Sequence, residues 1–344
     1  MSNNPNWKAT LQAIINRHNH RHAKRHKDVA ERTKAARASA LFVLFRQLRD
    51  LGFQLNPKHL DGNHVKHLFW YWTCDSQIEG RCRQYGVPML PQSHSAAYLQ
   101  FLVSTLRTFA QWIGKPGLIQ PLERYGMDAA LFARTYVALE DKGWESHGID
   151  IAQLLQRVAC IDERVAIMLE LIWRVGLRRK EAVMFQPWLA VKPAGLMPID
   201  HPVAEEYVAC LSVHRGTKGG RLRLIPLVSE VQRDAIARAK KYVAFPTAYL
   251  GHPHMTLLQA LDRYKNVLST AGITKKVLGV TGHGLRHQFA GDKFFDLAHI
   301  ACPVRGGDPL HDSELLERVL GAVSQQLGHN RPQITQAYCG SQRT

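Results

Sequence analysis

The feature that most constrains the fold of this chain is a tyrosine near its C-terminal end, preceded by a short histidine motif. Leu327-Gly328-His329 places a histidine nine positions before Tyr338, and six residues follow the tyrosine. Such a tyrosine is either the last hydrophobic anchor of a closing helix or a nucleophile that enters late into a site built by the rest of the chain. The upstream sequence favours the second interpretation, which requires a fold that brings distant segments to this residue.

Three upstream motifs carry side chains that suit chemistry on a phosphate. They are Gly176-Leu177-Arg178 with Glu181 three residues later, the Gly216–Gly220 turn around Lys218, and His283-Gly284-Leu285-Arg286-His287. A guanidinium can donate two parallel hydrogen bonds to phosphate oxygens, which an ammonium group cannot do. Arg178 follows the end of one predicted helix and precedes the next, where free backbone N–H groups also favour an anion.

In this order, Arg, Lys, His, Arg, His and Tyr, the motifs resemble those of the tyrosine recombinases, the phage integrase family. The resemblance covers the C-terminal two thirds of the chain. It implies a mainly α fold with a small β-sheet, in which an N-terminal helical core-binding (SAM-like) bundle precedes a mixed α/β catalytic domain. The residues that it marks as catalytic are Arg178, Lys218, His283, Arg286, His329 and Tyr338.

The chemistry available to these residues is a transesterification. Two arginines can compensate the charge that grows on a phosphodiester during attack. A phenol has an ordinary pKa of about 10 and needs a proton acceptor, for which His283 is suited. The resemblance makes Lys218 the general acid for the departing 5′-hydroxyl, with a hydrogen bond from His329 to the phosphate. Attack by Tyr338 would conserve the bond energy in a 3′-phosphotyrosyl link, so no metal or other cofactor is expected.

The expected function is therefore that of a site-specific DNA recombinase, an integrase of a phage or other mobile element. The expected partner is double-stranded DNA with specific recombination sites, bound by a homotetramer on paired sites, with accessory DNA-bending or directionality proteins. Two alternatives stay open: a type IB topoisomerase-like enzyme that only relaxes DNA, and a non-catalytic DNA-binding regulator on the same fold. A zinc protease is disfavoured, because no glutamate follows His283 in the gap before His287.

Charge supports a polyanionic partner. Forty-five basic residues against 28 acidic ones give a net charge of +17 and a pI near 9.8, and neutralising phosphates releases condensed counterions. The six cysteines show no CxxC spacing, so neither a zinc ribbon nor a disulfide framework is indicated. With no apolar leader or membrane-length run, the chain is expected to be cytoplasmic, and of bacterial or phage origin.

Three domains are predicted: a basic N-terminal arm at 1–28, a helical DNA core-binding domain at 29–147 and a catalytic domain at 148–344. The histidines interleaved with cations in the arm could suggest a metal tract, but a solvated arm along DNA phosphates is favoured. The residues expected to bind DNA are Arg21, Lys24, Arg25, Lys27, Arg107 and Lys115.

Hydrophobic periodicity predicts helices over 39–51, 65–72, 95–113 and 128–140, a helix that ends at Gly176, and another from Asp312. Around 207–227 the period changes to two, which predicts a β-hairpin with Lys218 at its tip.

Three departures from the family pattern are apparent. Arg178 and Lys218 are 40 positions apart and Arg286 and His329 are 43 apart, both long, and the second interval contains a loop-like stretch at 302–309. The tail after Tyr338 is short for docking on a neighbouring subunit.

Overall fold

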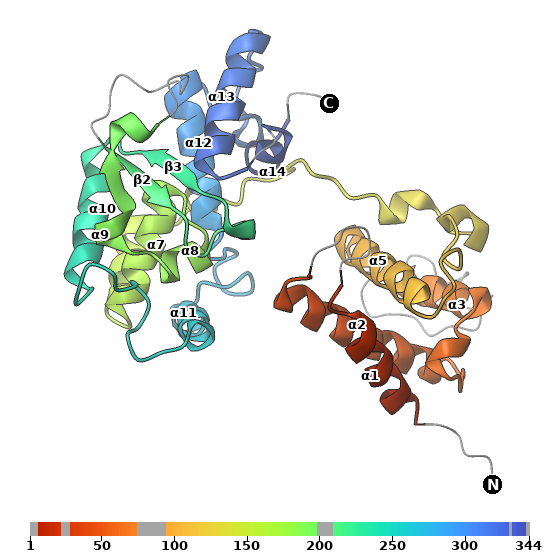
Figure 1. Cartoon of the computed structure of the whole chain (residues 1–344). Coiled ribbons are helices and arrows are strands. Elements are labelled where there is room, and N and C mark those ends of the chain that lie inside the picture. Colours follow the sequence, from red (N-terminus) through yellow and green to blue (C-terminus); the bar gives the residue numbers. More distant parts are fainter. Residues whose placement is uncertain (1–5, 22–27, 74–93, 198–208, 330–331, 342–344) are drawn as a thin grey trace. The chain divides into compact units, whose positions relative to one another are not determined.

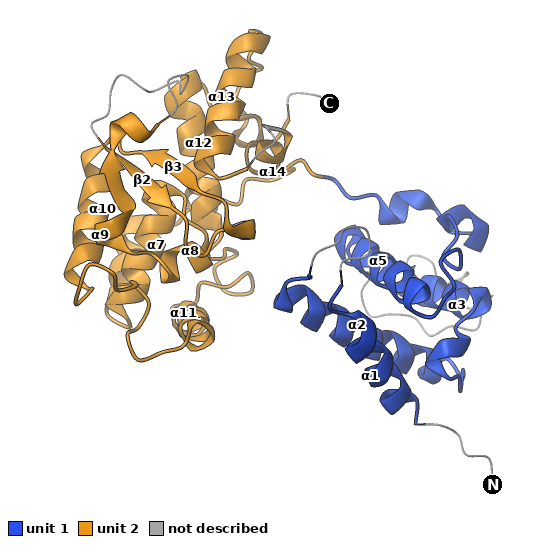
Figure 2. Ribbon diagram, in the orientation of Figure 1, with its two compact units in different colours: residues 1–135 blue, residues 136–344 orange. Residues whose placement is uncertain are grey.

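The computed structural model describes residues 6–21, 28–73, 94–197, 209–329 and 332–341. Its contacts divide the chain into two compact units, residues 1–135 and residues 136–344 (Figure 2). The predicted fold class is confirmed, since the described elements are mainly helices and the second unit contains a three-stranded sheet. None of the described helices is long and apolar enough to cross a membrane.

The first unit is a helical bundle. The described residues of this unit form the α-helices α1 (Trp7–His18), α2 (Glu31–Asp50), α3 (Gly62–Thr73) and α5 (Ala96–Trp112) (Figure 1). The predicted stripe on α2 is buried, and Gly52 after it has φ +93°, a left-handed conformation that favours glycine. Ser95 caps α5, as the sequence predicts, by accepting a hydrogen bond from the backbone N–H of Tyr98.

Two expectations for this unit are wrong. Residues 7–18 were expected within a solvated arm, yet they form helix α1 with Leu11, Ile14 and Ile15 buried, because apolar residues three and four apart make one face of a helix. Residues 128–140 were expected to form a helix, yet only the short 3₁₀ helix η4 (Ala129–Phe132) forms there. Tyr136 and Leu139 are exposed rather than inward, so no continuous apolar face supports a longer helix.

The second unit begins at Tyr136, so it includes residues 136–147, which are predicted from the sequence to belong to the helical domain. The backbone N–H of Ala138 donates to the carbonyl oxygen of Gln336 at 2.8 Å. Trp144 is fully buried, and its indole N–H donates to the carbonyl of Thr281 at 2.9 Å. Residues 136–147 are therefore attached to the second unit.

Helix α7 (Glu163–Val175) is the centre of this unit. It packs against α6 (Ile151–Ala159), α10 (Glu230–Lys241) and α12 (Gly284–Ala298), and its buried face extends through Val165, Met168, Leu169 and Ile172. Shorter helices α8 (Arg179–Val183) and α9 (Pro187–Ala190) follow it, and α11 (Leu257–Thr270) packs on α8.

The sheet is antiparallel, with strand order β1 (Val191–Pro193), β2 (Ala209–Val213) and β3 (Arg223–Pro226). The predicted hairpin is thus confirmed as β2 and β3, while β1 was not anticipated. The pairing places Val213 opposite Arg223. Because Val213 faces the core, its partner Arg223 does so too.

The C-terminal part packs on α12. It consists of η8 (Pro303–Arg305), α13 (Ser313–Gln326), which Asp312 caps as expected, η9 (Pro332–Thr335) and α14 (Gln336–Cys339). Both α13 and α14 contact α12, and a small apolar cluster between them includes Phe289, Val323 and Tyr338.

Candidate active site

Arg178 lies in the tight connection between α7 and α8. Gly176 ends α7 with φ +62°, and a Cβ atom there would lie 2.5 Å from the ring of Phe289, so a glycine is required. Arg178 then caps α8, its backbone N–H bound to Glu181 Oε2 at 2.7 Å. Its guanidinium donates to Glu181 Oε1 at 2.7 Å and to the carbonyl of Leu327 at 3.0 Å, and about a quarter of the side chain stays exposed.

Arg286 enters the same place from the first turn of α12. It is fully buried, and its terminal nitrogens donate to the carbonyl oxygens of Gly176 and Leu327. Its Nε donates to the hydroxyl of Tyr338 at 3.3 Å. Arg178 and Arg286 therefore share the carbonyl of Leu327, and the second arginine also holds the tyrosine.

A third arginine, Arg223 on β3, was missed by the sequence reasoning. It donates to the carbonyls of Gly176 at 3.2 Å and Gln326 at 2.9 Å, and to Glu181 Oε2 at 2.8 Å. Extending the hairpin register from inward-facing Val213 would have indicated its position. It also explains the glycine of the Leu-Gly-His motif, since a Cβ on Gly328 would lie 2.7 Å from Arg223 Cδ.

Among the described residues, Glu181 is the carboxylate that pairs with Arg178 and Arg223, and it is completely buried. Burial alone would raise its pKa, but the charges of Arg223, Arg178 and Arg286 hold it below the ordinary value. Burial lowers the pKa of Arg223 to about 9, with Glu181 acting in the opposite direction. At neutral pH three cations thus face one anion, and the excess positive charge in a region of low dielectric attracts an anion.

Tyr338 lies on α14, is 9 % exposed, and is surrounded by three histidines. Its ring centroid lies 4.6 Å from that of His287, 5.5 Å from that of His329 and 6.0 Å from that of His283. The sequence favoured a tyrosine that enters the site late, whereas the structure places it beside Arg286 already.

All three histidines have lowered pKa values. Desolvation, reinforced by Arg286 and Arg178, lowers the pKa of His283 to about 4 and that of His329 to about 3. Desolvation and the nearby His283 lower the pKa of His287 to about 3. His283 as a whole residue is exposed to solvent. Neutral imidazoles can accept a proton, so His283 is suited to act as a base at neutral pH.

Among the described residues, the Nδ1 atoms of His287 and His329 are buried and have no hydrogen-bond partner. A buried polar atom without a partner is costly, by about 1–3 kcal/mol. His329 is held by its backbone, with its N–H donating to the carbonyl of Ser324 at 2.8 Å. The Nδ1 atom of His329 therefore lies near Arg286 and Arg178 and makes no hydrogen bond within the described residues.

Lys218 is the predicted site residue for which the structure describes only the backbone. Its backbone lies in the 3₁₀ turn η7 (Lys218–Gly220) between β2 and β3, while its side chain lies outside what the structure describes. The turn itself is placed firmly on the site, because Gly216 packs so close to α8 that a Cβ there would lie 2.7 Å from the carbonyl oxygen of Lys180.

The residues expected to bind DNA fall into three groups. Lys24, Arg25 and Lys27 lie outside the described residues. Arg21 and Arg107 are exposed on the first unit, and Arg107 lines a cavity of about 480 Å³ beside α5. Lys115 donates instead to the carbonyl of Leu60 at 2.9 Å, which gives it a structural role in the bundle.

No group of three or more histidine, cysteine, aspartate or glutamate side chains within the described ranges could hold a metal ion. The site just described is instead built from guanidinium groups, imidazoles and a phenol. These groups together can bind a phosphodiester, move a proton and supply an oxygen nucleophile.

Part of this chain is similar in sequence to a known protein family. A sequence model of the family described as Integrase matches residues 145–292. No curated protein sequence matched the chain.

Solved structures share the fold. A lambda integrase dimer bound to a COC′ core site has a TM-score of 0.55 at 13 % identity, over 97 % of this chain and 78 % of that one. A dimer of lambda integrase residues 75–356 bound to a COC′ core site has a TM-score of 0.54 at 13 % identity, over 96 % of both chains. XerH site-specific recombinase bound to difH substrate, in a pre-cleavage complex, has a TM-score of 0.50 at 14 % identity, over 98 % of this chain and 81 % of that one.

Proposed function

We propose that this chain, a tyrosine recombinase of the integrase family, cuts and rejoins DNA at specific sites through a 3′-phosphotyrosyl intermediate on Tyr338. The single observation that carries this assignment is the convergence of Arg178 and Arg286 on the carbonyl of Leu327, with the hydroxyl of Tyr338 hydrogen-bonded to Arg286. Segments that are 149 residues apart in the sequence meet at this one acceptor. A nucleophile and two phosphate-binding groups are thereby preorganised in one place.

In this proposal the arginines bind the scissile phosphate. Arg178 has part of its guanidinium exposed, while Arg286 is positioned deeper by backbone carbonyls. Glu181 and Arg223 are not assigned a contact with the substrate. Glu181 is an anion that would repel a phosphate, and Arg223 directs its terminal nitrogens to the carbonyls of Gly176 and Gln326 and to Glu181. Their role is to hold Arg178 and the carbonyl acceptors in place.

Proton transfer falls to the histidines and the hairpin lysine. His283, neutral at working pH because of its low pKa, takes the proton of Tyr338 as the phenol oxygen attacks phosphorus. His329 donates a hydrogen bond to a phosphate oxygen, for which its buried Nδ1 is available. Lys218 protonates the departing 5′-oxygen from the hairpin turn. Reversal of these steps, with a 5′-hydroxyl of another strand as the nucleophile, rejoins the DNA.

The proposed partners are double-stranded DNA with paired recombination sites, a homotetramer of this chain, and accessory DNA-bending or directionality proteins. The net charge of +17 supports a polyanionic partner. We place this activity in the cytoplasm of a bacterial or phage-infected cell, as integration or excision of a mobile element.

Recombination of a plasmid with two purified sites tests this function. The sites are sought as direct repeats in the DNA that flanks the gene. Exchange of markers between the two sites is expected. Relaxation of a supercoiled plasmid without exchange, at equal rates on plasmids with and without the repeats, would instead establish the topoisomerase-like alternative. Binding with neither reaction would leave a DNA-binding regulator.

A further inference from the structure

The segment that leads into the second unit is bonded to the segment that carries the nucleophile. The backbone N–H of Ala138 donates to the carbonyl oxygen of Gln336 at 2.8 Å, two residues before Tyr338. Three residues later, Asp141 accepts a hydrogen bond of 3.0 Å from Arg305 Nε. The chain therefore enters the catalytic unit alongside the residues that would cleave DNA.

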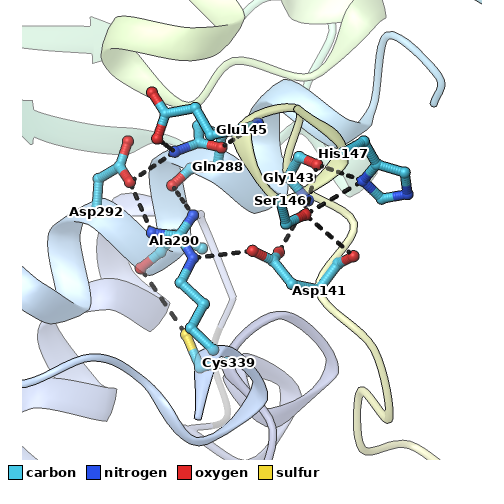
Figure 3. Close-up of polar contacts among 10 residues, drawn as sticks. Asp141, Gly143, Glu145, Ser146, His147, Gln288, Ala290, Asp292 and Cys339 are labelled. Atoms are coloured by element: carbon cyan, nitrogen blue, oxygen red, sulfur yellow. Dashed lines mark hydrogen bonds and ion pairs between the residues drawn. The ribbon is translucent and has the colours of Figure 1, made fainter. Parts of the chain in front are cut away.

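Arg305 joins this entering segment to helix α12. Its NH1 donates to Asp292 Oδ1 at 2.8 Å and its NH2 to the carbonyl of Gln288 at 3.3 Å, while Nε is taken by Asp141. Figure 3 shows Asp141, Gln288 and Asp292 gathered around one group of polar contacts. Burial alone would lower the pKa of Arg305, but the hydrogen bond and charge of Asp292 and the charge of Asp141 raise it.

Gln288 continues the connection on the same helix. It is fully buried, and its Nε2 donates to Glu145 Oε2 at 2.7 Å and to Asp292 Oδ1 at 2.9 Å. Its Oε1 accepts from the backbone N–H of Glu145 at 3.3 Å. Gln288 stands two residues after Arg286, so the entering segment is attached to the first turns of the helix that positions a phosphate-binding arginine.

The neighbouring glycines make room for these contacts. A Cβ on Gly291 would lie 2.3 Å from Arg305 Cζ, and one on Gly143 would lie 2.7 Å from Gln288 Oε1. Any larger residue at either position would displace the side chains that connect the elements. The guanidinium of Arg305 thus packs against α12 at Gly291, where the absence of a side chain leaves room for it.

The short helix that carries Arg305 also supports the tyrosine. A Cβ on Gly340 would lie 2.9 Å from the backbone nitrogen of Val304, so the chain just after Tyr338 packs directly on η8. Cys302 and Cys339 are fully buried in the same apolar cluster as Tyr338, and Cys339 Sγ lies 3.8 Å from the carbonyl of Ala290 on α12.

We propose that Arg305 is a positioning residue for Tyr338, which fixes η8 between the entering segment at Asp141 and helix α12 at Asp292, so that the tyrosine segment is held against Arg286. This rests on the proposed function of Tyr338. It also assigns a role to the long interval between Arg286 and His329, because that interval contains the loop that brings Arg305 to the site.

The test compares Arg305→Met, Arg305→Lys and Asp141→Asn in the full chain. On a suicide substrate at saturating DNA, Arg305→Met is expected to slow covalent adduct formation by about 10-fold to 100-fold, the scale of a small misplacement of a reacting group. The DNA affinity should stay close to that of the wild type. Arg305→Lys should recover most of the rate, since it keeps a cation that can reach one carboxylate. Asp141→Asn should be slower than wild type, and adding it to Arg305→Met should cause little further loss.

A second readout does not depend on the chemistry. Alkylation of Cys339 by iodoacetamide, mapped by mass spectrometry, should become faster in Arg305→Met because η8 no longer covers it firmly. Arg238→Met is the matched control, since Arg238 also pairs with a carboxylate, that of Glu170, and its hydrogen bonds go to that residue and not to the contacts around Arg305; it should change neither the adduct rate nor the alkylation.

The outcomes are distinguishable. A wild-type adduct rate and wild-type Cys339 protection in Arg305→Met would overturn the positioning role. If Arg305→Met does not fold, Asp141→Asn decides, and wild-type behaviour there overturns the proposal. Absence of any adduct with the wild-type chain would contradict the proposed function instead, while the alkylation result still tests the connection through Arg305.

Discussion

The Nε atom of Arg286 donates a hydrogen bond of 3.3 Å to the hydroxyl oxygen of Tyr338. The guanidinium that is proposed to bind the scissile phosphate therefore also holds the proposed nucleophile. The terminal nitrogens of Arg286 are bonded to backbone carbonyls and its Nε to the tyrosine hydroxyl, so we expect a phosphate to take the place of that hydroxyl at Nε. Docking of DNA should accordingly move this hydroxyl from the arginine toward the phosphorus atom and toward His283.

Substitution of Arg223 tests how the arginines are held. Arg223→Met leaves the carboxylate of Glu181 buried with one partner fewer, and breaking such a pair costs about 3–5 kcal/mol. Urea denaturation should show a loss of this size. Arg238→Met, which removes a half-exposed ion pair, should cost less than about 1 kcal/mol. Equal losses for the two variants would contradict the role of Arg223 as a buried support.

The low pKa values of the site histidines predict a pH dependence of stability. His287 and His329 have folded pKa values of about 3, against about 6.5 in the unfolded chain. Between these values the unfolded state binds more protons, so the free energy of unfolding should fall as the pH is lowered from 7 to 5. The lowered pKa of Glu181 reduces the free energy of unfolding only at lower pH, below the ordinary glutamate value of 4.5.

Denaturation at several pH values measures this effect. His287→Phe, which removes one of these titrating groups while keeping an aromatic ring, should flatten the slope between pH 7 and pH 5. An unchanged slope in that variant would show that His287 titrates normally in the folded protein.

Lys218 is predicted to protonate the leaving group. Lys218→Ala should cleave an ordinary site slowly but recover on DNA with a 5′-bridging phosphorothiolate, whose thiolate leaves without a proton. Gel separation of the covalent adduct measures both rates. If the modified substrate brings no recovery, the general acid is another residue, with Lys275 and Lys276 the next to substitute.

The cations at Lys24, Arg25 and Lys27 are predicted to bind phosphates rather than bases. Replacing all three with alanine should weaken binding to specific and random DNA alike. The slope of log K against log salt concentration should become shallower by up to about three, one for each lost phosphate contact. Lys115→Met should mainly lower stability, because that ammonium group binds the carbonyl of Leu60. A loss confined to the specific site would make these cations sequence readers.

The sequence predicted those parts that depend on local rules. Gly176 ends α7 in a left-handed conformation, Ser95 and Asp312 cap their helices, and the period of two around residue 210 became β2 and β3. Arg178, Arg286, His329 and Tyr338 were named from motif order alone, and the structure brings them together.

Other features depend on contacts between distant segments, which periodicity does not carry. Arg223 has the appearance of one surface cation in a basic hairpin, and its burial follows only from pairing with Val213 and from Glu181 behind it. In the sequence, Arg305 lies in a loop-like stretch to which no role is assigned. Only the structure shows that it bonds to Asp141 and Asp292, which are distant from it in the chain. Helix α1 was not predicted, because the many cations of residues 1–28 favoured a solvated arm. Its apolar residues Leu11, Ile14 and Ile15 nevertheless form a buried face.

The central claim is that Tyr338 is the nucleophile, and a suicide substrate nicked near the cleavage point tests it most directly. The wild-type chain should be trapped on the 3′ phosphate as a covalent adduct that is stable in detergent. Tyr338→Phe removes one hydroxyl and a hydrogen bond to Arg286 but almost no packing area, so it should bind the same DNA and give no adduct. A detergent-stable adduct that persists with Tyr338→Phe would place the nucleophile elsewhere and contradict the account.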